Sequence, residues 1–515
     1  MRRIGIDVGG TNTDAVLIEG DKVIHAVKRA TTEDVTSGIL AALAALRADP
    51  RVGATPIDAV MIGTTHFTNA VVQRRHLSKV AAIRLGMPAS ASLPPFCDWP
   101  ADLAELVQGD VVMLEGGHDY DGRPIMPLDE KGLRAAARRI RAAGLTSVAV
   151  SAVFSPLDAS GEERAGEILR EECPDAAVTL SHDLGRIGLL ERENAALLNA
   201  ALTDLARRTV QAFRDAIATS GIKAPLFITQ NDGTVMQADQ AAAFPVFSFA
   251  SGPTNSMRGA AHLSGLEDAM VVDVGGTTSD IGMLKRGFPR EANAVVQVGG
   301  VRTLFRMPDL LSIGLGGGSL VVPDPLAIGP RSVGYRLTED ARVFGGAHLT
   351  TTDIAVAGGL VDLGDRARVA DLAPDLVRAA IARAAAMLAE SVDRMKTDAG
   401  DVPLIAVGGG AFLVPDRMEG VSEIVRVENG AVANAVGAAI AQISGEADQV
   451  FKGLTREQAL DAARKAAEER ATRAGADPAT LSVVEMEDLP LAYLPGDALR
   501  ARVRVVGGIA AGVAA

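Results

Sequence analysis

The chain has 515 residues, with 51 Lys and Arg against 64 Asp and Glu and a formal net charge of −13. Such a length exceeds one hydrophobic core and predicts several domains. The acidic balance and an aromatic content of 3% argue against nucleic-acid binding, which needs a basic face or a stacking platform. Two cysteines exclude a disulfide framework and favour a reducing compartment. Without a signal peptide or a transmembrane run, we expect a cytoplasmic protein that binds neither membrane nor nucleic acid.

The N-terminal segment predicts a β-hairpin. The apolar run Arg3 to Val8 leads into Gly9-Gly10-Thr11-Asn12-Thr13, and a second apolar run, Ala15 to Ile18, follows. The glycines permit turn conformations that a Cβ would forbid and leave backbone N–H groups uncovered. The strand pattern continues to Ala30, and we expect a helix from Asp34 to about Arg47 after it.

Alternating strands and helices follow and predict a parallel or mixed sheet flanked by helices. The strand Ala59 to Gly63 is followed by a helix from Asp129 to Ala143, ended by Gly144, and a buried strand from Ser147 to Phe154. The region from Ser160 to Ser220 is mostly helical. A strand from Phe227 to Gln230 and a helix from Ser251 to about Leu263 come next.

The hairpin pattern returns past the middle of the chain. Met270 to Val274 leads into Gly275-Gly276-Thr277-Thr278, with Asp273 at the position of Asp7, and Ile281 to Leu284 follows. The remaining expectations, in order, are a helix from Ala373 to Thr397, an apolar strand ending in Gly408-Gly409-Gly410, a helix from Gly430 to Ser444, a charged helix from Leu454 to Ala474, and short strands from Leu481 onward.

Two facing hairpins of this kind could grip the phosphates of a nucleotide, since bare N–H groups and hydroxyls bind phosphate and aspartate holds Mg²⁺ through water. A single Gly-Gly-Thr turn is also a common hairpin connection. Duplication, with an acid at the same place in each copy, favours the phosphate interpretation. For Gly408-Gly409-Gly410, a ligand turn and a plain strand-to-helix connection both stay open.

In order and spacing, these three segments resemble the phosphate-1, phosphate-2 and adenosine motifs of the actin-like ATPase superfamily. The resemblance implies ATP and Mg²⁺ as cofactors, with Asp7 and Asp273 facing the metal, largely through water, and Thr11 and Thr277 taking part in catalysis. The nucleotide-binding residues it implies are Gly9, Gly10, Asn12, Thr13, Gly275, Gly276, Thr278, Gly408, Gly409 and Gly410.

From Arg3 to about Gly445 the chain also resembles the hydantoinase A/5-oxoprolinase family. The matching segments are Gly63 to Ala70, Phe154 to Pro156, Glu191 to Asn194 with Asn199-Ala200, Gln230 to Gly233, Ser251 to Pro253, Ser312 to Ser319 and Leu349 to Asp353. They imply a substrate pocket made by His66, Asn69, Glu191, Arg192, Asn194, Ser251, Gly317 and Ser319. For His66, packing or a loop hydrogen bond is the alternative, and surface pairing is the alternative for the Glu191 group.

The chain departs from the family pattern at three places. Asn12 stands where many members have Phe, and Thr254-Asn255-Ser256 replaces a small glycine-rich run. Long members extend well beyond the last residue of this chain, so the resemblance is to a compact branch.

The resemblance implies an α/β fold: a two-lobed actin-like ATPase (ribonuclease-H-like) with an inserted α/β region. The expected segments are 1–85, the start of the first lobe; 86–185, the insertion; 186–265, a helical segment and the rest of the first lobe; 266–445, the second lobe; and 446–515, a C-terminal helix with short strands.

Family members use ATP to open lactam or imide rings, so the expected function is phosphorylation of the carbonyl oxygen of a hydantoin, 5-oxoproline or related cyclic amide. No nucleophilic triad is found, and phosphoryl transfer needs none. The alternatives are an ATP-driven activator or assembly subunit, including one of a ketone-carboxylase-like complex, and a small-molecule kinase. A hydantoinase B-like or other operon-encoded second subunit and a homo-oligomer are the expected partners.

Overall fold

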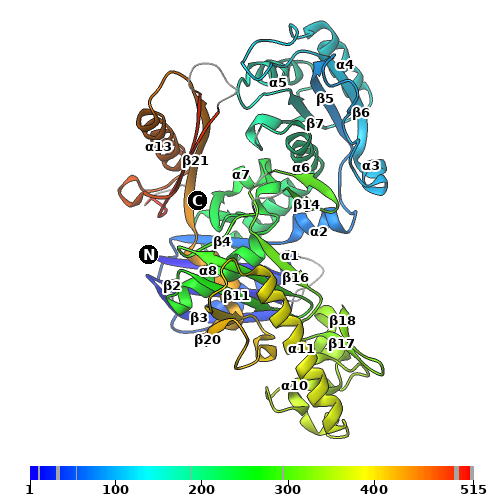
Figure 1. The fold of residues 1–515 in the computed structure, drawn as a ribbon, viewed down its shortest axis with the longest axis vertical. Coiled ribbons are helices and arrows are strands. Elements are labelled where there is room, and N and C mark those ends of the chain that lie inside the picture. The colour runs from blue at the N-terminus through cyan, green and yellow to red at the C-terminus, as the bar shows by residue number, and fades with distance from the viewer. Residues whose placement is uncertain are drawn as a thin grey trace.

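The computed structural model describes residues 1–9, 12–30, 35–53, 55–185, 187–292, 295–304, 306–491 and 498–510. The two lobes meet in the middle of the molecule, and part of the second lobe reaches its lower end (Figure 1). An inserted region lies above them at one side and the C-terminal segment at the other. Among the described residues, no helix combines the length and hydropathy required to span a membrane.

The first lobe is built on a nine-stranded sheet of order β22-β23-β21-β10-β9-β4-β1-β2-β3. Its strands are β1 (Arg2–Val8), β2 (Asn12–Glu19), β3 (Lys22–Ala30), β4 (Ala59–Thr64), β9 (Leu226–Thr229), β10 (Thr234–Gln237), β21 (Gln442–Phe451), β22 (Ser482–Pro490) and β23 (Leu499–Gly507). Strands β1, β4 and β9 run parallel, so their carboxyl ends share one edge. The helices α1 (Val35–Arg47), α6 (Leu189–Thr219) and α7 (Ala238–Ala243) share a core with one face of these strands.

The inserted region is a parallel four-stranded sheet of order β6-β5-β7-β8. Its strands are β5 (Val80–Met87), β6 (Gln108–Glu115), β7 (Ser147–Ala152) and β8 (Ala177–Leu180), and its helices are α3 (Ala101–Val107), α4 (Glu130–Ala142) and α5 (Ser160–Glu172). The short helix α2 (His66–Val72) leads into it. The expected α4 is confirmed: Asp129 caps it through the Gly132 N–H, and Gly144 follows it at φ +68°.

The second lobe repeats the strand order of the first. Its sheet, β13-β12-β11-β19-β20 with β16 also beside β12, is formed by β11 (Ala269–Val274), β12 (Ser279–Lys285), β13 (Phe288–Pro289), β16 (Leu310–Ile313), β19 (Val402–Val407) and β20 (Val421–Arg426). The other elements are β14 (Val296–Val298), β15 (Val301–Thr303), β17 (Ser319–Pro323), β18 (Leu326–Ser332), α9 (Leu337–Asp340), α10 (Thr351–Ala357) and α11 (Pro374–Met395). In both lobes a hairpin is flanked on one side by a third antiparallel strand and on the other by a parallel strand.

Two helices join the lobes, α8 (Ser251–Ser264) and α12 (Ala433–Ile440). They touch backbone to backbone: a Cβ on Gly259 would lie 1.8 Å from the Ala433 carbonyl oxygen, and one on Gly437 would lie 1.8 Å from the Asn255 carbonyl oxygen. Helix α12 also packs on the first-lobe strands β1 and β2, while α8 contacts β4 of the first lobe and β11 of the second. These two helices therefore connect the sheets of both lobes.

The C-terminal part of the chain corrects two expectations. The helix expected to reach Ser444 ends at Ile440, and strand β21 begins at Gln442. The expected short strands are nine residues each, and they extend the first-lobe sheet through β21. Helix α13 (Arg456–Arg473) covers one face of these strands with Ala459, Ala463, Ala467 and Ala471. Small residues on that stripe let the helix approach β21 closely, and they carry little hydrophobic signal in the sequence.

Candidate functional site

The two predicted hairpins are confirmed, with matching strand register and matching hydrogen bonds where each turn begins. In the first, Asp7 pairs with Asp14 across β1 and β2, and the Gly9 N–H donates to the Asn12 carbonyl at 3.0 Å. In the second, Asp273 pairs with Asp280, and the Gly275 N–H donates to the Thr278 carbonyl at 2.9 Å. Thr277 and Thr278 are exposed at the turn. Gly10 and Thr11 lie outside the described residues.

The aspartates of the two hairpins face the same space. Burial, followed by the charge of Asp14, raises the pKa of Asp7 to about 7, and the charge of Asp273 adds to that rise. Burial also raises the pKa of Asp273. The two carboxylates lie near one another, because Asn434 on α12 holds Asp7, Ser256 on α8 holds Asp273, and α8 and α12 are in backbone contact.

The interlobe helices hold both carboxylates in position. Ser256 on α8 donates its hydroxyl proton to Asp273 Oδ2 at 2.5 Å. Asn434, on α12, donates from Nδ2 to Asp7 Oδ2 at 2.8 Å. Ser256 belongs to the segment that departs from the family pattern, so the structure gives that segment a direct contact with the site.

One carboxylate oxygen of Asp7 is available to bind a cation. Its Oδ1 is buried without a hydrogen-bond partner in the described part of the chain, an arrangement that costs free energy unless something binds there. A Cβ on Gly63 would lie 2.7 Å from this oxygen, so only glycine leaves the space beside it open. Mg²⁺ binds through one or two carboxylates while keeping several waters, and the buried Asp7 with the half-buried Asp273 fits such an ion.

The predicted adenosine turn packs directly on the second hairpin. Gly408 follows β19 with φ +88°, and a Cβ there would lie 2.2 Å from Asp273 Oδ1. The Gly410 N–H donates to the Val274 carbonyl at 2.7 Å, whereas a Cβ on Gly409 would meet no heavy atom within 4 Å. The turn thus leaves open space beside Gly409, and its role with adenosine stays a prediction.

The glycine-rich loop Gly316 to Ser319 packs against the turn of the second hairpin and forms hydrogen bonds with it. Gly317 and Gly318 donate their N–H groups to the carbonyls of Gly275 and Gly276 at 2.9 and 2.7 Å. Ser319 Oγ accepts from the Gly316 N–H at 2.8 Å, and the four residues are buried. These contacts favour a positioning role for Gly317 and Ser319; their predicted contact with substrate is not tested by them.

His66, Asn69 and Ser251 gather at the carboxyl end of β4, beside β1. The Ser251 hydroxyl donates to the Thr64 carbonyl at 3.1 Å, and Asn69 Nδ2 donates to Thr65 Oγ1 at 3.3 Å. Burial lowers the pKa of His66, so its imidazole is neutral at pH 7. This group lies on the same sheet edge as Asp7, and its substrate role remains a prediction.

The Glu191 group lies elsewhere, where α6 meets the inserted region. The Arg192 guanidinium is fully buried and donates to the Ile187 carbonyl at 2.8 Å. Asn194 accepts from Trp99 Nε1 at 2.7 Å and donates to the Arg302 carbonyl at 3.0 Å. The Arg302 guanidinium in turn pairs with Glu191 at 3.2 Å. These contacts favour pairing within the protein, as in the alternative for this group, but Arg192 and Asn194 pair in the interior and not at the surface. Their contact with substrate stays a prediction.

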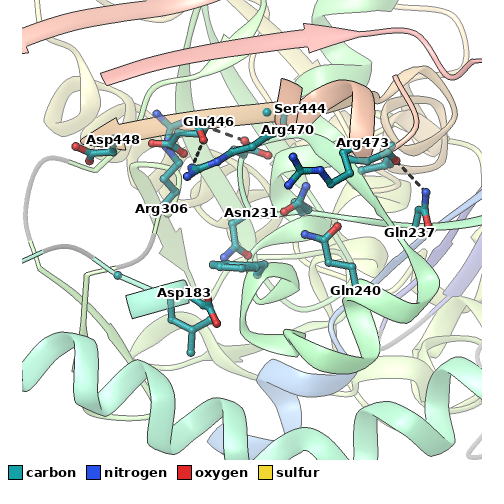
Figure 2. A pocket seen from close by; sticks show the side chains of 18 of the residues that line it. Asp183, Asn231, Gln237, Gln240, Arg306, Ser444, Glu446, Asp448, Arg470 and Arg473 are labelled. Carbon is teal, nitrogen blue, oxygen red and sulfur yellow. Dashed lines mark hydrogen bonds and ion pairs between the residues drawn. The ribbon is translucent and has the colours of Figure 1, made fainter. Parts of the chain in front are cut away.

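A cavity of about 580 Å³ lies between the β9–β10 turn, β21, the end of α13 and residues 182–185 (Figure 2). Arg470 crosses one side and donates to the Glu446 carbonyl at 2.6 Å. Its wall begins at Gln230, next to Thr229. Thr229 Oγ1 and Asp7 Oδ1 both lie within 3.2 Å of the position that a Gly63 Cβ would occupy, but neither Asp7 nor Asp273 lines the cavity.

The structure adds site residues that the sequence did not indicate. Lys28 lies opposite Asp14 on β3, with its ammonium 2.7 Å from both carboxylate oxygens. Asn434 and Ser312 are the other additions, the latter donating its hydroxyl proton to Asp280. Each of these residues contacts an aspartate on another strand or helix, and no local sequence pattern indicates that contact.

Comparison with known proteins identifies the family. Residues 3–173 match the family model of the hydantoinase/oxoprolinase N-terminal region, and residues 192–365 match that of hydantoinase/oxoprolinase. The chain belongs to the hydantoinase/oxoprolinase family. It is 27% identical over 398 residues to the acetophenone carboxylase gamma subunit of Aromatoleum aromaticum, covering 70% of this chain and 54% of that protein. It is 28% identical over 391 residues to caprolactamase subunit alpha of Pseudomonas jessenii, covering 69% and 54%.

This family member spans about half the length of the curated relatives it matches. Among solved structures, ATP-dependent caprolactamase from Pseudomonas jessenii superposes with a TM-score of 0.79 at 20% identity, over 98% of this chain and 87% of the other. Nucleotide-free acetone carboxylase gives 0.71 at 18% identity, over 100% and 89%. These similarities confirm the expected α/β, two-lobed actin-like ATPase fold.

Proposed function

We propose that this chain uses ATP to phosphorylate the carbonyl oxygen of a cyclic amide, such as a hydantoin, 5-oxoproline or a related lactam, and so drives opening of its ring. The observation that carries the proposal is the pair of matching hairpins whose aspartates, the buried Asp7 and the half-buried Asp273, are held near one another by the two crossing helices. Similarity to caprolactamase, whose name denotes a cyclic-amide substrate, supports this choice of substrate class.

In this proposal the two turns bind the nucleotide phosphates from opposite sides. The backbone N–H groups and the exposed hydroxyls of Thr277 and Thr278 are the proposed phosphate donors, whereas Thr13, also expected there, is fully buried. Asp7 with Asp273 would hold Mg²⁺, mostly through water. A bound Mg²⁺ would neutralise part of the negative charge of the phosphates. The protein contributes position: Ser256 and Asn434 fix the two carboxylates, and the Gly316 loop fixes the second turn.

The chemistry explains the need for ATP. A five-membered lactam is an unreactive amide whose ring closure is entropically favoured. Attack of its carbonyl oxygen on the γ-phosphorus gives an imidate phosphate and ADP. Water then adds to the imidate carbon, the ring nitrogen leaves as an amine, and a second water converts the acyl phosphate to carboxylate and phosphate. We propose the cavity beside Gln230 as the place of the ring, because it has the size of a small-molecule site and Gln230 follows Thr229, which neighbours Asp7.

A second candidate is the ATP-using subunit of a ketone carboxylase. The acetophenone carboxylase gamma subunit and the acetone carboxylase beta subunit are relatives at 27% and 25% identity, which favours this alternative specifically. Phosphorylation of a ketone's enolate oxygen would use the same hairpins. All three named relatives are subunits, so we also propose that a second protein acts with this chain.

The test is ATP turnover by the purified chain in the presence of cyclic amides or small ketones, each with and without proteins encoded beside its gene. Stimulation by a cyclic amide, together with the ring-opened product, supports the main proposal. Stimulation by ketones alone, with a carboxylated product in bicarbonate, supports the second candidate. A stable phosphate ester as product would instead identify a small-molecule kinase and contradict both.

A further inference from the structure

The two phosphate hairpins differ in one charge, although their geometry is otherwise repeated. In each lobe a third strand runs antiparallel beside the second hairpin strand. In the first lobe this strand, β3, places Lys28 opposite Asp14. In the second lobe the matching strand, β16, places Ser312 opposite Asp280. A cation therefore stands beside the first hairpin at the position where a hydroxyl stands beside the second.

Lys28 is partly exposed and held in place beside the first hairpin. Its ammonium lies 2.7 Å from both oxygens of Asp14, whose side chain is 2% exposed, while the lysine side chain keeps 35% exposure. An ammonium has three donors, and the contacts with Asp14 leave at least one of them unused. The lysine is thus anchored by a buried carboxylate and remains open on its other side.

The charge of Lys28 also reaches both lobes. Burial raises the pKa values of Asp7 and Asp273, and Lys28 acts against that rise in both. Among the described residues it is the one cation whose charge acts on Asp7, Asp14 and Asp273. A polyphosphate entering between the hairpins would meet several carboxylates and this single ammonium.

We propose that Lys28 is a phosphate-binding residue: anchored on Asp14, it donates a charge-assisted hydrogen bond to a phosphate oxygen of the nucleotide held between the hairpins. This assignment rests on the proposed function, since it requires the nucleotide site. It gives the first hairpin a role that the second lacks, because Ser312 offers no charge. Lysine suits this task as a compact charge that holds one carboxylate and one phosphate at once.

The test is MgATP binding by calorimetry together with the KM and kcat of ATP turnover. Lys28→Met should weaken binding at least about tenfold, equal to 1.4 kcal/mol, in protein that is still folded at the assay temperature, and Lys28→Arg should recover part of the loss. Lys22→Met, an exposed lysine at the other end of β3, is the matched control and should bind MgATP as the wild type does. If Lys28→Met unfolds at too low a temperature for the assay, Lys28→Gln is measured in its place.

The double variant Asp14→Asn/Lys28→Met separates phosphate binding from mere neutralisation of Asp14. If Lys28 served only as the counter-ion of Asp14, removing both charges would restore binding; we expect the double variant to remain weak. Restored binding, or wild-type binding by a folded Lys28→Met, overturns this inference alone. A wild-type chain that binds no MgATP overturns the proposed function, and the inference with it.

Discussion

The crossing of α8 and α12 gives the sharpest prediction, because one methyl group should disturb both stability and chemistry. In Gly437→Ala the new Cβ would lie 1.8 Å from the Asn255 carbonyl oxygen and 2.6 Å from its carbonyl carbon. Ordinary contact needs more than 3.4 Å, so the two helices must separate by more than an ångström. Overpacking of this kind typically costs 1–3 kcal/mol, and backbone atoms yield less readily than side chains.

Separation of the helices should also reach the aspartates. Asn255 is followed on α8 by Ser256, which holds Asp273, and Asn434 on α12 holds Asp7. We therefore expect Gly437→Ala to lower the melting temperature by several degrees, since 1 kcal/mol corresponds to about 2–4 °C in domains of 150–250 residues. We also expect ATP turnover to fall more than either Ser256→Ala or Asn434→Ala alone would reduce it.

The assay is differential scanning calorimetry combined with steady-state ATP turnover at saturating MgATP. Gly400→Ala is the matched control, because a Cβ there meets no heavy atom within 4 Å and its φ is not in the left-handed region. A Gly437→Ala protein with wild-type melting temperature and turnover would refute the reasoning that backbone contact at this crossing positions the two carboxylates.

Four further predictions follow from the site and the inserted region. Asp273→Asn should lower turnover about 100-fold while the protein still folds, because the charge that would align Mg²⁺ and phosphate is lost; near-normal turnover would make the second hairpin purely structural. MgATP at ~100 times its Kd should stabilise the protein by about 2.7 kcal/mol, visible as a higher melting temperature; no shift at millimolar MgATP would contradict the phosphate clamp. Burial alone would lower the pKa of His182, but its hydrogen bond with Glu162 at 2.9 Å and that residue's charge outweigh burial and raise it. The stability this contact adds is complete below the unfolded pKa of about 6.5 and is lost as pH rises through the higher folded value, so the melting temperature should fall between pH 6 and pH 8.5 by more in the wild type than in His182→Gln. Finally, the isolated chain should use ATP weakly or without ring opening, because an imidate phosphate needs a site closed to bulk water and the sequence shows no base to complete hydrolysis; stoichiometric ring opening per ATP by this chain alone would show a hydrolytic site not recognised here.

The two hairpins could be predicted from the sequence because their information is local. A strand, a Gly-Gly-Thr turn and a second strand fix the register within nine residues, so Asp7 must face Asp14 and Asp273 must face Asp280. Helix α4 was equally predictable, with Asp129 at its start and Gly144 after its end. The order of the segments further allowed the family and its fold to be recognised.

The partners of the aspartates were decided only by the tertiary structure. Asn434 reaches Asp7 across 427 positions in sequence, and Ser256 reaches Asp273 through the helix crossing at Gly437. Lys28 looks like any polar residue of an alternating strand until the register of β3 sets it opposite Asp14.

What the sequence determined by itself was the chemistry of each turn and the repetition of one lobe in the other. What only the folded chain decided was which distant side chains meet those turns and where the C-terminal strands pair. Strand β21 joins β10 and β23 through contacts between segments far apart in the chain. Its small residues Gly445 and Ala447 allow the alanine face of α13 to pack closely on it. Local patterns fix dihedral angles and periodicity, whereas such pairings depend on closing long loops, and no short stretch of sequence encodes that.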